Sequence, residues 1–154
     1  MEKIAVFAGS FCPFTKGHED IVRRAKQLFD KIIIAIGHNP DKKDAFSVQE
    51  RLDWICNIYN NDPKIEVAAY EGLTVDFCRK NNATYMIRGV RNASDITSES
   101  ELALINHELC DSIETVVLFT SPEFRAVSSS LVRELWRLGQ DYSKYLSYKL
   151  PKLP

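Results

Sequence analysis

Two hydrophobic patterns alternate along the chain, and this alternation restricts the possible folds more than any other feature of the sequence. Short apolar runs rich in β-branched residues are each followed by a stretch whose apolar residues recur three and four positions apart. The first pattern predicts strands at 3–8, 31–37, 65–70, 84–89 and 114–120. The second pattern predicts helices at 17–29, 47–59, 73–81, 98–110 and 128–138, with a short last helix at about 142–150.

Five β–α units in succession predict an α/β fold. Strands that alternate with helices form a parallel sheet with right-handed crossovers and helices on both faces. The run KIIIAIG at 31–37 is almost wholly apolar, as a strand covered on both faces must be. No linker, repeat or low-complexity segment divides the chain, so we expect one doubly wound domain over residues 1–154.

Composition argues against several classes of protein. The net charge is −1, which gives no general electrostatic attraction to nucleic acid. No stretch has the length and apolarity of a membrane span and no export signal is visible, so we expect a cytoplasmic protein without a membrane partner. The four cysteines form no CxxC pair and the three histidines are scattered, which argues against a zinc site.

A ligand is expected at the loops that follow the strands, because doubly wound sheets bind ligands beyond the carboxyl ends of their strands. The first such loop, GSFCPFTKGH, brings Ser10, Gly17 and His18 to the start of a helix. Unpaired amides at a helix N-terminus attract anions, and a glycine lets a ligand approach the backbone closely. The alternative is purely structural: Ser10 and Thr15 would cap the turn, and His18 would cap the helix.

Three further loops carry residues suited to phosphate. The run RGVR at 88–91 places two arginines beside a strand end, and arginine binds phosphate through paired N–H groups. Three serines at 128–130 open a helix, and Lys42 with Lys43 follows the second strand, although a lysine pair is often only a solvated surface. The chain lacks the GK[ST], GxGxxG and GxSxG fingerprints. The sequence therefore predicts a polyphosphate site assembled from several separate loops.

The loop GSFCPFTKGH resembles the (T/S)-x-G-H signature of the nucleotidyltransferase superfamily. Together with Lys42, IRGVR and VSSSLVRE, it makes the chain similar to the bacterial phosphopantetheine adenylyltransferases from the first strand to the 128–138 helix. These enzymes form dephospho-coenzyme A and pyrophosphate from ATP and 4′-phosphopantetheine. The resemblance implies a Rossmann-like fold, Mg²⁺ as cofactor, a homohexamer and feedback inhibition by coenzyme A.

The resemblance also implies roles for individual residues. His18 would stabilise the transition state, with Lys42 and Arg91 as further catalytic groups. Residues expected to bind phosphopantetheine are Ser10, Lys42, Thr74 and Arg88. Residues expected to bind ATP are Ser10, Phe11, Gly17, His18, Gly89, Val90, Arg91, Glu99, Phe124, Arg125, Ala126, Val127, Ser128, Ser129 and Ser130. The chain departs from the family at Cys12, where aspartate is usual, at ITSE (96–99), and at Phe124, where tryptophan is usual.

The implied reaction needs no general base. A phosphate monoester has a second pKa of about 6, so at neutral pH it is largely a dianion that can attack the α-phosphate of ATP directly. The obstacle is the repulsion between two anions. Positioned cations, amide hydrogens and Mg²⁺ carried on the phosphates would offset that repulsion, since phosphoryl-type transfer depends mainly on positioning and charge stabilisation.

Three other functions stay open on the sequence alone. Another small nucleotidyltransferase, such as a cytidylyltransferase or a nicotinate mononucleotide adenylyltransferase, usually has HxGH, whereas Thr15 stands at the first of these positions. A non-catalytic nucleotide sensor would have little reason to combine His18, Lys42 and Arg88. A flavodoxin-like electron carrier would need a single phosphate loop that the sequence does not contain.

Overall fold

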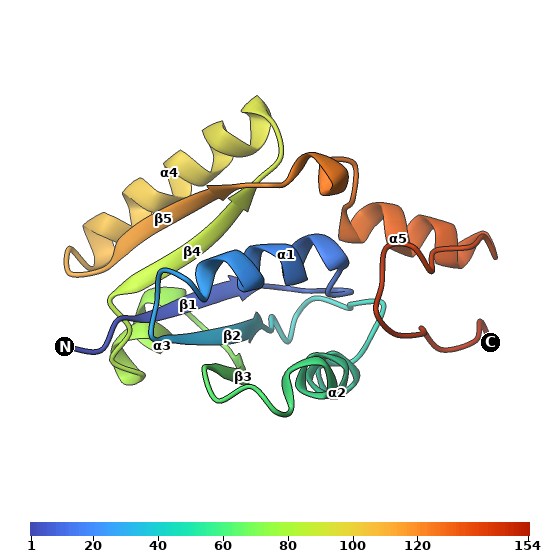
Figure 1. Cartoon of the computed structure of the whole chain (residues 1–154), viewed down its shortest axis with the longest axis horizontal. Coiled ribbons are helices and arrows are strands. Elements are labelled where there is room, and N and C mark those ends of the chain that lie inside the picture. Colours follow the sequence, from blue (N-terminus) through green and yellow to red (C-terminus); the bar gives the residue numbers. More distant parts are fainter.

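Five parallel strands form one sheet in the order β3-β2-β1-β4-β5 in the computed structural model, which describes residues 1–154 (Figure 1). The strands are β1 (Ile4–Gly9), β2 (Lys31–Gly37), β3 (Ile65–Tyr70), β4 (Tyr85–Val90) and β5 (Glu114–Phe119). The predicted parallel α/β sheet is confirmed, and each predicted strand begins and ends within one residue of the observed one.

The five predicted helices that follow these strands are also present. They are α1 (Lys16–Ala25), α2 (Val48–Tyr59), α3 (Thr74–Lys80), α4 (Ala93–Leu109) and α5 (Ser129–Arg137), with a short 3₁₀ helix η1 (Pro122–Phe124) before α5. Helix α4 begins earlier than the predicted residue 98, because the Asn92 side chain caps it and accepts the Asp95 amide at 2.9 Å. No helix is both long enough and apolar enough to cross a bilayer.

Both faces of the sheet are covered, as the apolar run in β2 predicted. Successive residues of a strand point to opposite faces. On one face Ile34 packs with Val22 of α1 and Ile55 of α2, and on the other face Ile33 packs with Val75 of α3. The central strands are therefore buried on both sides, and a ligand is expected at their carboxyl ends, where doubly wound sheets bind ligands.

The predicted helix at about 142–150 is wrong, because this segment forms turns after α5. Its tyrosines have helical spacing, but their hydroxyls form hydrogen bonds that a helix would not allow. The Leu150 amide donates to the Tyr142 hydroxyl at 2.9 Å, and the Tyr148 hydroxyl donates to the Phe14 carbonyl at 2.5 Å. With Leu146 and Leu150 buried, the segment packs beside α5 beyond the carboxyl ends of the strands (Figure 1).

Candidate active site

A cavity of about 340 Å³ lies at the carboxyl ends of β1 and β4. These strands are neighbours in the sheet, and the chain order reverses between them, which is where ligands bind in doubly wound folds. The loops after β1, β4 and β5 and the first turns of α1 and α5 form its walls. The predicted site residues that line it are Ser10, Phe11, Gly17, His18, Arg88, Gly89, Arg91, Glu99, Phe124, Val127, Ser128, Ser129 and Ser130.

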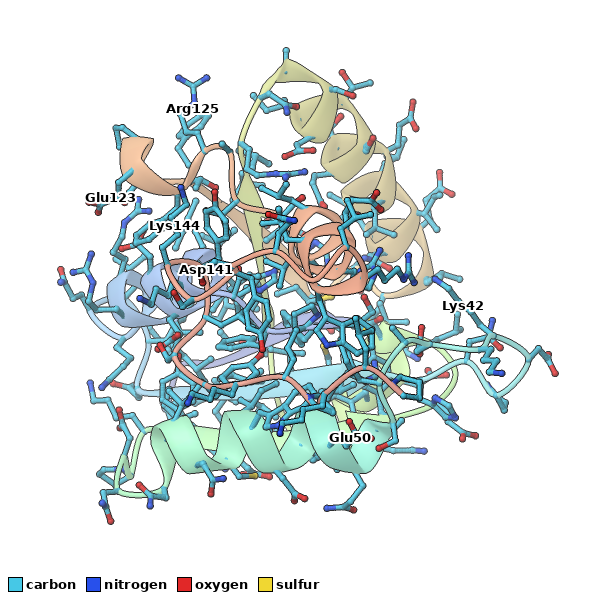
Figure 2. The ribbon with its side chains drawn as sticks, turned by 90° about the vertical axis from the view of Figure 1, so that its right-hand side faces the viewer. Lys42, Glu50, Glu123, Arg125, Asp141 and Lys144 are labelled. Carbon is cyan, nitrogen blue, oxygen red and sulfur yellow. The ribbon has the colours of Figure 1, made fainter.

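Five predicted residues do not line this cavity: Lys42, Thr74, Val90, Arg125 and Ala126. Lys42 is exposed on the loop after β2, and Figure 2 shows it far from Arg125, which is also exposed. Val90 is buried in the sheet. Thr74 lies in a small adjoining cavity that Arg88 and Glu99 also line, and its hydroxyl pairs with that of Tyr70 at 2.7 Å.

Seven lining residues were missing from the sequence-based set: Phe7, Ala8, Gly9, Thr15, Ile21, Asp95 and Thr120. Two of them carried a usable signal. Thr15 stands before α1 as its N-cap, and Asp95 follows the Asn92 cap of α4 by three residues. Thr120 follows the end of β5, and the others are apolar or small residues of β1 and α1, where nothing in the sequence distinguishes a cavity wall from core.

His18 sits in the first turn of α1 with one ring nitrogen already engaged. The Thr15 amide donates to His18 Nδ1 at 2.9 Å, and the His18 amide in turn donates to Thr15 Oγ1 at 3.4 Å. Since Nδ1 accepts a hydrogen bond, the neutral ring carries its proton on Nε2. The ring stacks on Phe14, with centroids 5.2 Å apart, and meets Phe11 edge-on at 5.0 Å.

The His18 imidazole is neutral at physiological pH. Burial, together with the positive charges of Arg91 and Arg88, lowers its pKa from 6.5 to about 4. A neutral ring with Nε2–H is a fixed hydrogen-bond donor that neither gains nor loses a proton near pH 7.

Arg88 is held in one orientation by a carboxylate and a carbonyl. Its Nε and Nη2 donate to the two oxygens of Glu99 at 2.6 and 2.7 Å, and its Nη1 donates to the Ala8 carbonyl at 2.7 Å. A guanidinium has five N–H donors, so two are left for an anion in the cavity. Both Glu99 oxygens bond to Arg88, so in this state Glu99 orients the arginine.

Arg91 is fixed in a similar way by Asp95. Its Nε donates to Asp95 Oδ2 at 3.2 Å, and its backbone amide donates to the same oxygen at 2.9 Å. The charged residues that line the cavity are thus two arginines and two carboxylates. Their formal charges cancel, and the surplus of cations expected from the sequence is absent because Lys42 lies elsewhere.

The three serines before and in α5 use their hydroxyls within the protein. Ser129 Oγ donates to the Pro13 carbonyl at 2.7 Å, Ser128 Oγ accepts the Leu131 amide at 3.1 Å, and Arg133 donates to Ser130 Oγ at 3.3 Å. The Ser129 and Ser130 amides, in the first turn of α5, have no acceptor within the chain. Of the three hydroxyls only that of Ser129 donates within the chain, so the Ser129 and Ser130 amides and the O–H groups of Ser128 and Ser130 are free for an anion.

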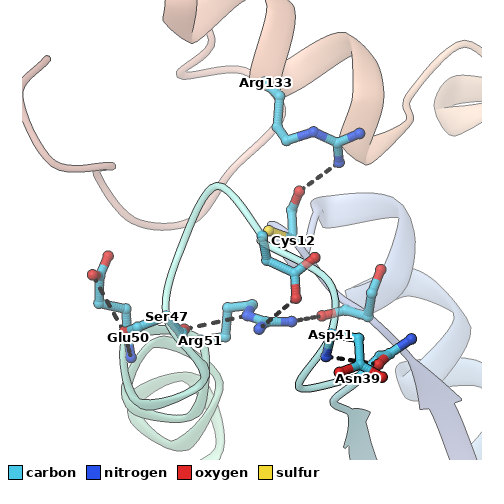
Figure 3. A network of polar contacts seen from close by, with 9 residues as sticks. Cys12, Asn39, Asp41, Ser47, Glu50, Arg51 and Arg133 are labelled. Atoms are coloured by element: carbon cyan, nitrogen blue, oxygen red, sulfur yellow. Dashed lines mark hydrogen bonds and ion pairs between the residues drawn. The ribbon is translucent and has the colours of Figure 1, made fainter.

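Sequence reasoning also missed Arg51, which does not line the cavity but binds the loop that does. Its side chain is only 1% exposed. It donates to the Ser10 carbonyl at 2.6 Å, to the Ser47 carbonyl at 3.2 Å and to Asp44 at 3.1 Å, and so ties the loops after β1 and β2 to α2 (Figure 3). A charged residue in a predicted amphipathic helix looks like a surface position, so no signal marked it.

No group of three or more His, Cys, Asp or Glu side chains is arranged to hold a metal ion. The two carboxylates in the cavity are already paired with arginines. A Mg²⁺ ion would therefore fit here only if its ligands were mainly water and the phosphates of a bound nucleotide, which is a common mode for this ion.

Comparison with known proteins gives concordant matches in sequence and fold. The cytidylyltransferase-like family model matches residues 6–135. The phosphopantetheine adenylyltransferase of Cytophaga hutchinsonii is 43% identical over 97% of this chain and 100% of its own length. That of Porphyromonas gingivalis is 46% identical over 94% of each chain.

Solved structures support the fold. A bifunctional NMN adenylyltransferase/ADP ribose pyrophosphatase from Francisella tularensis superposes with a TM-score of 0.72 at 20% identity. The match covers 98% of this chain but 46% of that longer one. The nicotinic acid mononucleotide adenylyltransferase of Plasmodium falciparum superposes with a TM-score of 0.68 at 20% identity and covers 96% and 91% of the two chains. The Rossmann-like nucleotidyltransferase fold is therefore confirmed.

Proposed function

Because the chain belongs to the cytidylyltransferase-like family and, within it, to the phosphopantetheine adenylyltransferases, we propose that it transfers the adenylyl group of ATP to 4′-phosphopantetheine. Membership makes it a nucleotidyltransferase of coenzyme A biosynthesis. The products are dephospho-coenzyme A and pyrophosphate. The substrate phosphate attacks the α-phosphate in line, so that one P–O bond forms as the bond to pyrophosphate breaks.

The observation that carries the proposal is the combination of donors around one cavity. A neutral His18, the spare N–H groups of Arg88 and the free amides at the start of α5 come from three distant parts of the chain. All of them donate hydrogen bonds, and none is a base or a nucleophile poised by a partner. Such a site suits a reaction between phosphates, where charge must be stabilised and no proton need be removed.

We assign the residues as follows. His18 Nε2–H donates to a non-bridging oxygen of the α-phosphate, where charge builds in the transition state. Arg88 binds the phosphopantetheine phosphate, beside the small cavity where Thr74 would meet the pantetheine arm. Arg91 and the amides of Ser129 and Ser130 bind the phosphates of ATP.

Because the charged side chains of the cavity cancel, we propose that Mg²⁺ supplies positive charge for the reaction. Two anions meet in a site whose arginines are each paired with a carboxylate. A Mg²⁺ ion bound to the triphosphate would supply the positive charge that these residues do not. Lys42 would add charge only if its exposed loop closed over bound substrate, which is how we include it in the site.

One assay tests the function. Purified protein, ATP and Mg²⁺ are incubated with phosphopantetheine, glycerol phosphate or nicotinate mononucleotide, and released pyrophosphate is measured. Of the three acceptors, we expect only phosphopantetheine to give pyrophosphate release, with dephospho-coenzyme A as the second product. Release with glycerol phosphate or nicotinate mononucleotide would assign the chain to another nucleotidyltransferase activity, and release with none would indicate a nucleotide sensor.

Gly17 provides an independent test of where ATP binds. A Cβ at this position would meet Thr15 Oγ1 at 3.4 Å and Phe124 Cβ at 3.7 Å, which are ordinary contacts with two residues of the cavity wall. Packing therefore does not require glycine. We expect Gly17→Ala to fold with unchanged or slightly raised thermal stability, since alanine favours helix by about 1 kcal/mol. The added methyl group should nevertheless keep ATP from approaching the backbone closely. The KM for ATP should therefore rise about tenfold, which corresponds to the loss of roughly one hydrogen bond.

An equal loss for both substrates in the Gly17→Ala kinetics would contradict this assignment. So would a lower melting temperature, because it would show that the protein itself needs glycine there. Circular dichroism melting and kinetics with each substrate varied in turn give the two readouts.

We also propose an assembly and a mode of regulation for the protein. The outer face of α4 and β5 exposes large apolar side chains around a groove of about 580 Å³, with Leu104 60% and Phe119 67% exposed. Such a face is typical of a subunit interface, and we propose a homohexamer.

Coenzyme A, which contains both the pantetheine and the adenylyl parts, is the proposed feedback inhibitor. All four cysteines are free, which suits the reducing cytoplasm where we place the reaction.

A further inference from the structure

Side chains from three elements hold the backbone carbonyls of the loop before α1. The Ser10 carbonyl accepts from Arg51 of α2, and the Cys12 carbonyl accepts from Arg133 of α5 at 2.7 Å (Figure 3). The Pro13 carbonyl accepts from Ser129 of α5. The last of these carbonyls, that of Phe14, accepts from the hydroxyl of Tyr148 at 2.5 Å. Tyr148 lies in the C-terminal segment, which the family model does not include.

The Phe14 carbonyl belongs to the same peptide group as the Thr15 amide. In a trans peptide the C=O and N–H bonds are coplanar and point in opposite directions. On one side of this group Tyr148 donates to the carbonyl, and on the other side the amide donates to His18 Nδ1 at 2.9 Å. A continuous hydrogen-bonded chain thus runs from the Tyr148 hydroxyl through one peptide to the imidazole.

We propose that Tyr148 is a positioning residue for His18, because its hydroxyl fixes the peptide whose amide sets the orientation and the tautomer of the imidazole. Donation to the carbonyl also polarises the peptide and makes its N–H a better donor. With Nδ1 held as an acceptor, Nε2–H is the donor available to the cavity. The inference rests on the proposed function for the role of His18, whereas the link between the two side chains stands on geometry alone.

Tyr148 is itself rigidly placed, as a positioning residue must be. Its ring stacks on Trp54 of α2, with centroids 5.1 Å apart and planes inclined by 21°. Burial, reinforced by the charge of Glu19, raises the pKa of its hydroxyl, which therefore stays protonated and donates throughout the working pH range. Neighbouring residues of the segment also hold α1: the Lys16 amide donates to the Tyr145 carbonyl at 2.8 Å, and Ser147 donates to Glu19 at 2.6 Å.

The competing explanation is that Tyr148 only helps the segment to pack. Tyr142 provides a matched control, because its hydroxyl makes a hydrogen bond inside the same segment, to the Leu150 amide, and none to the loop. Tyr148→Phe and Tyr142→Phe each delete one hydroxyl and keep the ring. If only packing matters, the two variants should behave alike.

The experiment compares both variants with the wild type in two ways. Nitrogen-15 NMR of the imidazole reports the tautomer and pKa of His18, and steady-state kinetics reports kcat and KM. In the wild type we expect the Nε2–H tautomer. In Tyr148→Phe we expect altered His18 and Thr15 amide resonances, a His18 pKa raised toward its ordinary value, and kcat lowered about 3- to 10-fold with both KM values unchanged. Arg88, Arg91 and the aromatic rings face His18 equally in all three proteins. A difference in the His18 resonances between the two variants would therefore come from the peptide between Phe14 and Thr15.

Several results would overturn the proposal. An Nδ1–H tautomer in the wild type would do so without any variant. Unchanged His18 resonances in folded Tyr148→Phe would do so whatever the kinetics, and so would equal effects of Tyr142→Phe. If the wild type forms no dephospho-coenzyme A, the proposed function fails, while the NMR comparison still decides whether Tyr148 positions His18.

Discussion

Replacing His18 with alanine is expected to lower the turnover of ATP and phosphopantetheine by at least about 10²- to 10³-fold, the usual cost of one preorganised oxyanion donor. The ring is held by the Thr15 amide and stacked on Phe14, so its Nε2–H is fixed before substrate binds. The fold should persist, because β1 and its loop are held by the sheet and by Arg51. Pyrophosphate release under saturating substrates measures the loss.

Two further substitutions show which nitrogen matters. A glutamine amide reaches roughly the position of Nε2 and an asparagine amide that of Nδ1. His18→Gln should therefore retain more turnover than His18→Ala, and His18→Asn should not. Near-normal turnover in folded His18→Ala would refute the role of the residue, and rescue by asparagine alone would place the donor on the wrong nitrogen.

The pH dependence of stability checks the neutral state of the ring. His18 titrates at about 4 in the folded chain and near 6.5 when unfolded, so between these values the unfolded state binds the extra proton. The wild type should lose stability relative to His18→Ala as the pH falls from 6.5 to 4, and the two should respond alike to pH above 7. Thermal melts across this range supply the measurement. A charged imidazole in the folded protein would produce no such difference.

Arg88→Ala should raise the KM for phosphopantetheine by about 100-fold or more while changing the KM for ATP far less. The substitution removes a charged donor pair, and charge-assisted hydrogen bonds are worth about 1.5–3 kcal/mol each. It also leaves the Glu99 carboxylate, 15% exposed, without its partner and beside the incoming phosphate. Repulsion from that carboxylate adds to the lost attraction. Kinetics with each substrate varied separately measures the split.

Arg79 offers a matched control for Arg88. It also binds one carboxylate, Asp76 at 2.9 Å, and one backbone carbonyl, that of Leu109 at 2.7 Å, but it lies outside the cavity. Arg79→Ala should leave both KM values unchanged. In Arg88→Ala/Glu99→Ala the repulsion disappears, so part of the loss should be recovered. Equal losses for ATP and phosphopantetheine in Arg88→Ala would contradict the division of the site.

Much of the fold could be predicted because its signals are local. The apolar run of β2 and the helical spacing in α1 each lie within a few consecutive residues, and five such units leave few alternatives to a parallel sheet. The same logic failed at 142–150, where the tyrosines have helical spacing but the Tyr142 hydroxyl accepts the Leu150 amide and the Tyr148 hydroxyl donates to the Phe14 carbonyl, 134 residues away. Hydrogen bonds of that kind have no periodicity for a sequence to display.

The candidate site, like the fold, could be predicted only in part. Its location followed from topology, because the loops that contain Ser10, Arg88 and Ser129 had to meet at the carboxyl ends of the strands. How the charges are paired did not follow. Arg88 could have been a free cation and the Ser129 hydroxyl could have faced an anion, but Arg88 pairs with Glu99 and the Ser129 hydroxyl donates to the Pro13 carbonyl. A guanidinium or hydroxyl has many possible acceptors, and only packed coordinates select one.

The order of strands and helices along the chain, the edge of the sheet where the cavity lies and most of the residues that line it could therefore be predicted from the sequence. Only the tertiary structure decided that His18 is neutral, that Lys42 stands outside the cavity, and that Arg51 and Tyr148 support the loop from positions 41 and 134 residues away from their partners. The physical reason is the separation along the sequence over which each interaction acts. Hydrophobic periodicity is encoded between near neighbours, whereas burial, charge pairing and tautomer depend on groups that become neighbours only when the chain has folded.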